Sequence, residues 1–165
     1  MARSFDILAE SVASVDQIHA AFGREDYWLD RLADDVSASL DSLVVETNGS
    51  VTVQLTQYLG RQLLPGAVAN MIPGDLKLLY QETWRPADDG HVHGTATVAV
   101  GELGSSRAKN LLAPTANGSQ LRSALTVQVK IPFVGGAVEK AVGASLTQSI
   151  PSVLRFTTTW IADHV

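Results

Sequence analysis

A carboxylate on a predicted strand is the residue whose position most strongly indicates chemistry. Glu82 alternates with Leu78, Tyr80 and Trp84, so strand parity places all four on one face of a sheet, toward the interior. A carboxylate that faces an apolar interior is costly unless it is hydrogen-bonded, paired or protonated. We therefore expect Glu82 to anchor a ligand or to act as a general acid or base.

A structural role for this carboxylate stays open beside the chemical one. In that alternative Glu82 pairs with Arg61, with Arg107 or with a tyrosine hydroxyl, or it lies near a strand end that water reaches. Gln57 and Tyr80 are the other polar side chains that strand parity directs toward the same interior.

Two histidines form a second candidate group. His91 and His93 are two residues apart on a strand and project to one face, where such a pair can bind zinc. The sequence offers no third ligand at a suitable spacing, and the apolar Val92 lies on the opposite face. We expect solvated histidines beside a turn, and we find no evident partner for His19 or His164.

Sequence motifs for the common catalytic and cofactor sites are absent. The chain has no Gly-x-Ser-x-Gly elbow, no P-loop and no dinucleotide-binding Gly-x-Gly-x-x-Gly, so we predict no cofactor and no metal. Twelve basic residues are scattered and the formal charge is −5, which disfavours nucleic acid as a partner.

Composition predicts one globular domain over residues 1–165. Hydrophobic residues make up 45% of the chain and charged residues 18%. Cysteine is absent, and Asp6 and Glu10 interrupt the opening segment, which therefore does not read as a signal peptide. No apolar run approaches the length of a membrane span, so we expect no stable membrane insertion and a cytoplasmic location.

The C-terminal 34 residues decide the architecture. A strand pattern ends at Ile131-Pro132, a turn follows at 133–136, and a long amphipathic helix then runs almost to the C-terminus. Pro151 inside this helix predicts a kink near Thr147–Pro151, either where the helix crosses a cavity or where it follows a curved sheet.

Strands and short helices precede that helix. Residues 3–11 read as a first strand, and two short helices follow, the first capped by Ser14 with Gln17 and ended by Gly23. From about residue 40 apolar residues alternate in six strands, with turns that include Asn48-Gly49 and Asn117-Gly118. The order predicts an α+β protein with a mainly antiparallel sheet.

The segment 61–74 breaks the alternation. It contains Leu63, Leu64, Val68, Met71 and Ile72 between or just before two Pro-Gly pairs. We expect a short apolar helix or a flap over a cavity mouth, in which Met71 adapts to varied ligands. A core plug or a homodimer contact is the alternative.

A likeness to a known family is carried by the passages Phe5–Phe22, Gln81–Pro86, Val129–Lys140 and Phe156–Trp160. On these passages the chain resembles the helix-grip fold of the START-like (Bet v 1-like, SRPBCC) superfamily and, within it, the actinobacterial family of unknown function DUF2505. The likeness covers essentially the whole chain, and the Pro-Phe-Val-Gly-Gly-x-x-Glu-Lys passage is fairly specific to the family. The resemblance implies a sheet of about seven strands wrapped around the long helix, with a cavity for an apolar or amphipathic ligand between them.

The resemblance and strand parity together give a set of cavity-lining candidates. We expect a lipid- or polyketide-like ligand to contact Leu55, Gln57, Met71, Leu78, Tyr80, Glu82, Trp84, Val98, Leu125, Val127, Leu146, Ile150 and Leu154. Binding, transport or sensing is the expected function. The alternatives are a cyclase or dehydratase that uses Glu82 as acid or base, and an interaction module with a filled core.

Overall fold

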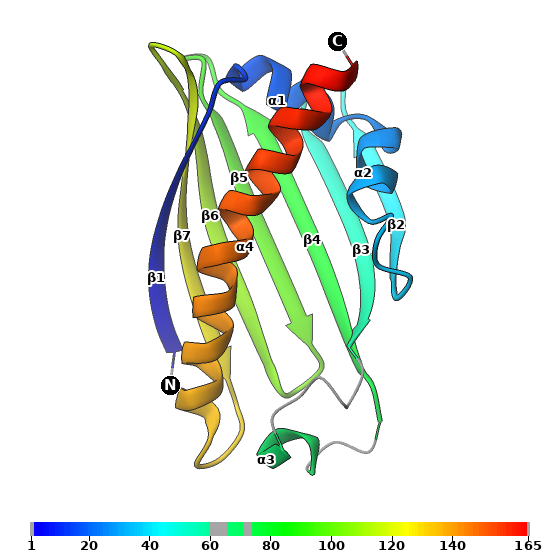
Figure 1. The fold of residues 1–165 in the computed structure, drawn as a ribbon, viewed down its shortest axis with the longest axis vertical. Helices are drawn as coiled ribbons and strands as arrows, with labels where there is room; N and C mark the ends of the chain where they lie inside the picture. Colours follow the sequence, from blue (N-terminus) through cyan, green and yellow to red (C-terminus); the bar gives the residue numbers. More distant parts are fainter. Residues whose placement is uncertain (1, 60–65, 71–73, 165) are drawn as a thin grey trace.

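A seven-stranded antiparallel sheet with one long helix across its inner face makes up the fold (Figure 1). The computed structural model describes residues 2–59, 66–70 and 74–164. The elements are β1 (Ala2–Ser11), α1 (Val15–Phe22), α2 (Glu25–Arg31), β2 (Ala38–Val45), β3 (Val51–Leu59), α3 (Gly66–Ala69), β4 (Leu76–Pro86), β5 (Val92–Val100), β6 (Gly104–Thr115), β7 (Gly118–Val129) and α4 (Gly135–His164). The predicted helix-grip architecture is confirmed.

The strands pair in the order β1-β7-β6-β5-β4-β3-β2, so the first two strands form the two opposite edges of the sheet. α1 and α2 carry the chain from one edge to the other at one end of the molecule (Figure 1). The capping box at Ser14 and Gln17 starts α1 as predicted, and its buried residues lie on one face. The Asn48-Gly49 hairpin between β2 and β3 is also confirmed, and Gly49 supplies the left-handed backbone that the turn requires.

Aromatic side chains fill the end of the molecule near α1 and α2. Tyr27 and Trp28 are fully buried, and both pack against Phe22. The indole N–H of Trp28 donates to the Phe22 carbonyl over 2.7 Å, while Tyr27 meets Trp160 of α4 edge to face. This cluster closes one end of the space between α4 and the sheet.

The long helix packs mainly against β1 and β7, and therefore lies over one side of the sheet. Gly143 allows this close approach, because a Cβ atom at that position would lie 2.0 Å from the ring of Phe5. The helix continues through Pro151 without a break, and Figure 1 shows its C-terminal half inclined to its N-terminal half. The predicted kink is thus a bend within one continuous helix.

The turn from β7 into α4 gives a structural role to Glu139, a residue of the passage that carried the family resemblance. Glu139 is 1% exposed, and its Oε2 accepts the backbone N–H of Val129 over 2.9 Å. This hydrogen bond satisfies the donor at the point where β7 ends and ties the strand to the first turns of the helix. Glu139 belongs to the family-specific passage, but its position in the sequence predicted no role for it.

Candidate functional site

A cavity of about 250 Å³ lies between α4 and the inner face of the sheet. The uneven placement of α4 accounts for it, since the inner faces of β4 to β6 are left without a closely packed helix. Most of its walls are apolar, and the polar groups come from α2, the sheet and one side of α4. The lining consists of Phe22, Arg31, Tyr80, Glu82, Trp84, Ala96, Thr97, Val98, Ser106, Ala108, Asn110, Leu112, Leu121, Leu125, Leu146, Ser149, Ile150, Val153, Leu154 and Thr157.

Many of the predicted lining residues do border this cavity. They are Tyr80, Glu82, Trp84, Val98, Leu125, Leu146, Ile150 and Leu154. Leu55 and Val127 do not, because both are buried in the packed core elsewhere on the inner face. Leu78 is half-buried on the inner face of β4 but lies outside the lining, and Met71 lies outside the described residues.

A tryptophan forms one wall. Trp84 is 3% exposed, and its ring covers Gly94 on β5, where a Cβ atom would come within 2.5 Å of the indole. A larger residue at position 94 would push the ring from this place. The indole N–H of Trp84 is buried and has no hydrogen-bond partner among the described residues.

An ion pair forms the polar wall. Arg31 Nη1 at the end of α2 lies 3.6 Å from Glu82 Oε2 on β4, and the two side chains are 21% and 14% exposed. The guanidinium also lies over the ring of Trp28, 4.7 Å from its centroid. Burial lowers the pKa of Arg31, but the attraction of Glu82, together with Tyr27 and Tyr80, outweighs it and raises the pKa above its ordinary value.

The partner of Glu82 therefore differs from the arginines named in the sequence analysis. Arg107 is exposed on β6 and does not line the cavity, while Arg61 lies outside the described residues. Arg31 was missed, although its spacing of three from Trp28 places the two on one side of a helix. That spacing is the signal that could have identified it.

Two tyrosine hydroxyls stand beside this pair, each held by a hydrogen bond. Tyr80 donates to Gln57 Oε1 over 3.0 Å, and the Gln57 amide donates in turn to Asp35. Gln57, predicted to face the cavity, thus positions Tyr80 from outside the lining. Burial raises the pKa of Tyr80, and the nearby Asp35 carboxylate raises it further.

Tyr27 lies 2.6 Å from the Thr157 hydroxyl, which donates its own proton to the Val153 carbonyl over 2.8 Å. The Tyr27 hydroxyl is therefore the donor to Thr157. Burial raises the pKa of Tyr27, so this hydroxyl stays protonated at neutral pH.

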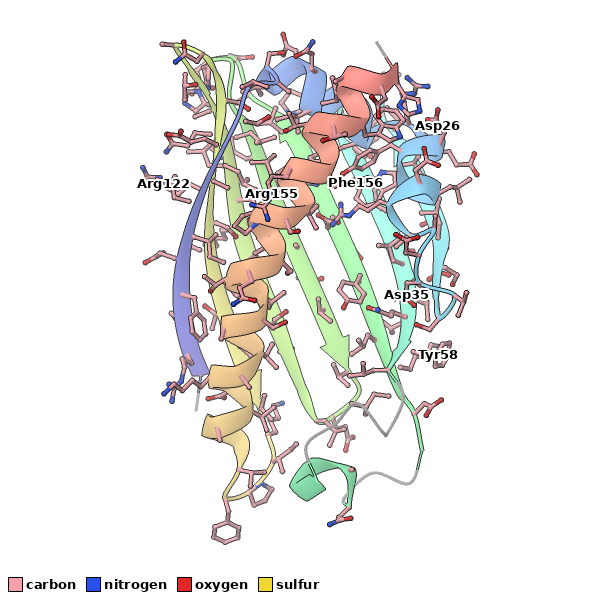
Figure 2. All side chains as sticks on the ribbon, viewed as in Figure 1. Asp26, Asp35, Tyr58, Arg122, Arg155 and Phe156 are labelled. Atoms are coloured by element: carbon pink, nitrogen blue, oxygen red, sulfur yellow. The ribbon has the colours of Figure 1, made fainter. Side chains whose placement is uncertain are left out.

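A depression of about 490 Å³ on the outer surface meets the cavity between α2 and α4. Arg31, Ser149 and Val153 line both spaces, so Arg31 stands at the boundary between them. Figure 2 shows Phe156 on the side of α4 nearest α2, at the edge of this depression. The remaining lining residues are Ser145, Gln148 and Ser152, which add polar groups to this depression.

The histidines lie away from this site. His93 is exposed on β5, as predicted, and His91 pairs with Asp89 in the preceding turn. His19 and His164 do have partners, contrary to expectation, because each ring forms a hydrogen bond with a backbone carbonyl, of Gly49 and of Trp160. Within the described ranges no three His, Cys, Asp or Glu side chains gather in a way that could hold a metal ion.

Comparison with known proteins places this architecture in a family. The model of the family described as "Protein of unknown function (DUF2505)" matches residues 6–161. The chain belongs to the DUF2505 family. It is 36% identical over 176 residues to the uncharacterized proteins Rv0481c of Mycobacterium tuberculosis H37Rv and Mb0491c of Mycobacterium bovis, covering all of this chain and all of each relative.

Solved structures show the same fold at low sequence identity. Ara h 8.0201 superposes with a TM-score of 0.58 at 14% identity, and TTHA0849 from Thermus thermophilus with 0.57 at 13%, each over 99% of both chains. Norcoclaurine synthase from Thalictrum flavum, solved in complex with dopamine and hydroxybenzaldehyde, gives 0.51 at 18%, over 100% of this chain and 89% of that one. The DUF2505 chain thus has the Bet v 1-like helix-grip fold. In the part of the chain that the structure describes, no helix has the length and apolar character to span a bilayer.

Proposed function

We propose that this protein reversibly binds one small, mainly apolar molecule in the cavity under α4, as a carrier or a sensor. The void itself is the observation that supports this proposal most directly. Protein interiors are normally packed to the density of organic crystals, with few voids larger than a water molecule. A space of about 250 Å³ among Ala96, Ala108, Leu125 and Leu146 is far larger than that.

The size of the cavity restricts the ligand. Pockets that take drug-sized molecules measure roughly 300–1,000 Å³, so a cavity of about 250 Å³ falls just below that range. A short acyl chain or a molecule of one or two rings fits better than a sterol or a long-chain lipid. The ligand is therefore at the small end of the lipid- and polyketide-like class that the family resemblance implies.

Calorimetric titration with small aromatic compounds tests the proposal. We expect one-to-one binding with a negative heat-capacity change, the signature of apolar surface leaving water. The substitution Ala108→Leu places a larger side chain in the cavity and should weaken binding at least 10-fold, about the effect of losing 1.4 kcal/mol. Ala124→Leu, on the exposed side of β7, is the matched control and should bind like the wild type. Binding that is equal in all three proteins would refute the cavity as the site.

The exposure of Glu82 to the cavity keeps the enzymatic alternative open. Glu82 borders the void, and the structure gives its carboxylate an ion pair with Arg31 but no hydrogen bond within the described residues. Such a group can transfer a proton to or from a bound molecule. Glu82→Gln separates the two functions. The apolar walls and an acceptor oxygen at position 82 remain, so a small neutral ligand should still be retained, whereas turnover should be abolished if an acid or base is required.

A further inference from the structure

We infer that the cavity selects a neutral ligand whose polar group both accepts and donates a hydrogen bond, such as a phenol or an alcohol, and that this group lies between Arg31 and Glu82. The inference rests on the proposed function, because it specifies the ligand of the same cavity. It is carried by the geometry of the ion pair and by the charge balance around it.

The ion pair is open to a third group. The 3.6 Å between Arg31 Nη1 and Glu82 Oε2 is longer than a charge-assisted hydrogen bond, which spans about 2.7–2.9 Å. A guanidinium carries several N–H donors, and an ionised carboxylate only accepts. Tyr27 donates its own proton to Thr157, so its oxygen can accept one hydrogen bond from Arg31. Neither oxygen of Glu82 receives a hydrogen bond from the described residues. A hydroxyl in this place would accept from Arg31 and donate to Glu82.

The opposite charges of Arg31 and Glu82 disfavour an ionic ligand. The pair is neutral as a unit, and a net charge placed in a mostly apolar cavity must find a partner of opposite sign to offset its desolvation. An anion that approached Arg31 would face Glu82, with Asp35 behind Tyr80 as a further negative charge. A cation that approached Glu82 would face Arg31. A neutral hydroxyl meets no repulsion from either side.

A series of naphthalene derivatives tests this selectivity on one apolar scaffold at pH 7. The probes are naphthalene, 2-naphthol, 2-methoxynaphthalene, which only accepts, 2-naphthoate, which is anionic, and 2-naphthylmethylamine, which is cationic. We expect 2-naphthol to bind the wild type most tightly, by at least about 10-fold over each of the others, because only it satisfies donor and acceptor together. This comparison needs no variant.

Two substitutions should then change the preference in opposite directions. Glu82→Gln leaves the positive charge of Arg31 without its partner, so 2-naphthoate should become the preferred probe. Arg31→Gln leaves Glu82 alone, so the amine should become preferred. Arg122→Gln is the control, because Arg122 is exposed on β7 and points away from the cavity (Figure 2). Thermal melting curves establish that each variant is folded.

The possible outcomes separate this inference from the proposed function. If no probe binds the wild type, the proposed function fails and the inference fails with it. If naphthalene binds as tightly as 2-naphthol, or 2-naphthoate binds more tightly, the cavity stands and the neutral-ligand inference is overturned. The inference is likewise overturned if both charge variants fold and keep the wild-type order of affinities.

Discussion

Filling the cavity should stabilise the protein, which is the opposite of what a larger side chain does in a packed core. Ala108 lies on the inner face of β6, between Ala96 on β5 and Leu125 on β7, and it lines the void. Ala108→Leu adds roughly three carbon atoms, each worth about 0.8 kcal/mol when transferred from water to an apolar environment. The expected gain in the free energy of unfolding is therefore about 2 kcal/mol, provided the added atoms enter empty space.

Urea denaturation and thermal melting measure this gain. For a chain of 165 residues, about 2 kcal/mol corresponds to an increase in Tm of about 4–8 °C. The control Ala124→Leu adds the same atoms on the exposed side of the neighbouring strand and should change stability by less than about 0.5 kcal/mol. If the site were already packed, Ala108→Leu would instead cost about 1–3 kcal/mol through overpacking, and a loss of that size would refute the void.

Three further predictions concern the parts of the fold that frame the site. Glu139→Ala removes the buried acceptor of the half-buried Val129 N–H and should lower the free energy of unfolding by about 1–3 kcal/mol. Glu139→Gln keeps an acceptor and should cost less, so equal losses in denaturant titrations would contradict this role. Gly143→Ala should destabilise the protein, because its Cβ would lie 2.0 Å from the Phe5 ring, and this clash should outweigh the roughly 1 kcal/mol that alanine gains over glycine in a helix. In a Phe5→Leu background the same substitution should cost less stability, and a double-mutant cycle that shows no coupling would exclude the contact. The pKa of Asp35 is lowered from 3.8, chiefly by the Ser37 hydroxyl, so the ionised carboxylate stabilises the folded state above that pH, and this stabilisation is lost as the pH falls through the lowered pKa. The Tm difference between wild type and Asp35→Asn should therefore be constant above about pH 5 and shrink below it. A Tm difference that does not change with pH would contradict the assignment.

Strand periodicity predicted which face each residue occupies, but not which part of that face borders the cavity. Glu82, Tyr80 and Trp84 were placed inward by parity, and all three line the void. Leu55 and Val127 were placed inward as well, but they pack in the filled parts of the core. The difference depends on where α4 crosses the sheet, which follows from long-range contacts such as that between Gly143 and Phe5. A period of two carries no information on such contacts.

The role of Arg31 was harder to predict for a different reason. It belongs to a short helix rich in charged residues, where an arginine is most often solvated. Its burial results from the turn between α1 and α2, which directs Trp28 into the aromatic cluster and brings Arg31 with it toward Glu82. The predicted flap, including Met71, stays a prediction, because 60–65 and 71–73 lie outside the described residues.

Native mass spectrometry of the protein purified from its source organism tests the central claim most directly. We predict a fraction of the wild-type protein with one added small molecule, which is released on unfolding and is absent from Ala108→Leu but present in Ala124→Leu. The mass of the released molecule would also identify the ligand. A wild-type protein without any bound molecule, which also fails to take up each of the naphthalene probes, would contradict the claim that the cavity is a binding site.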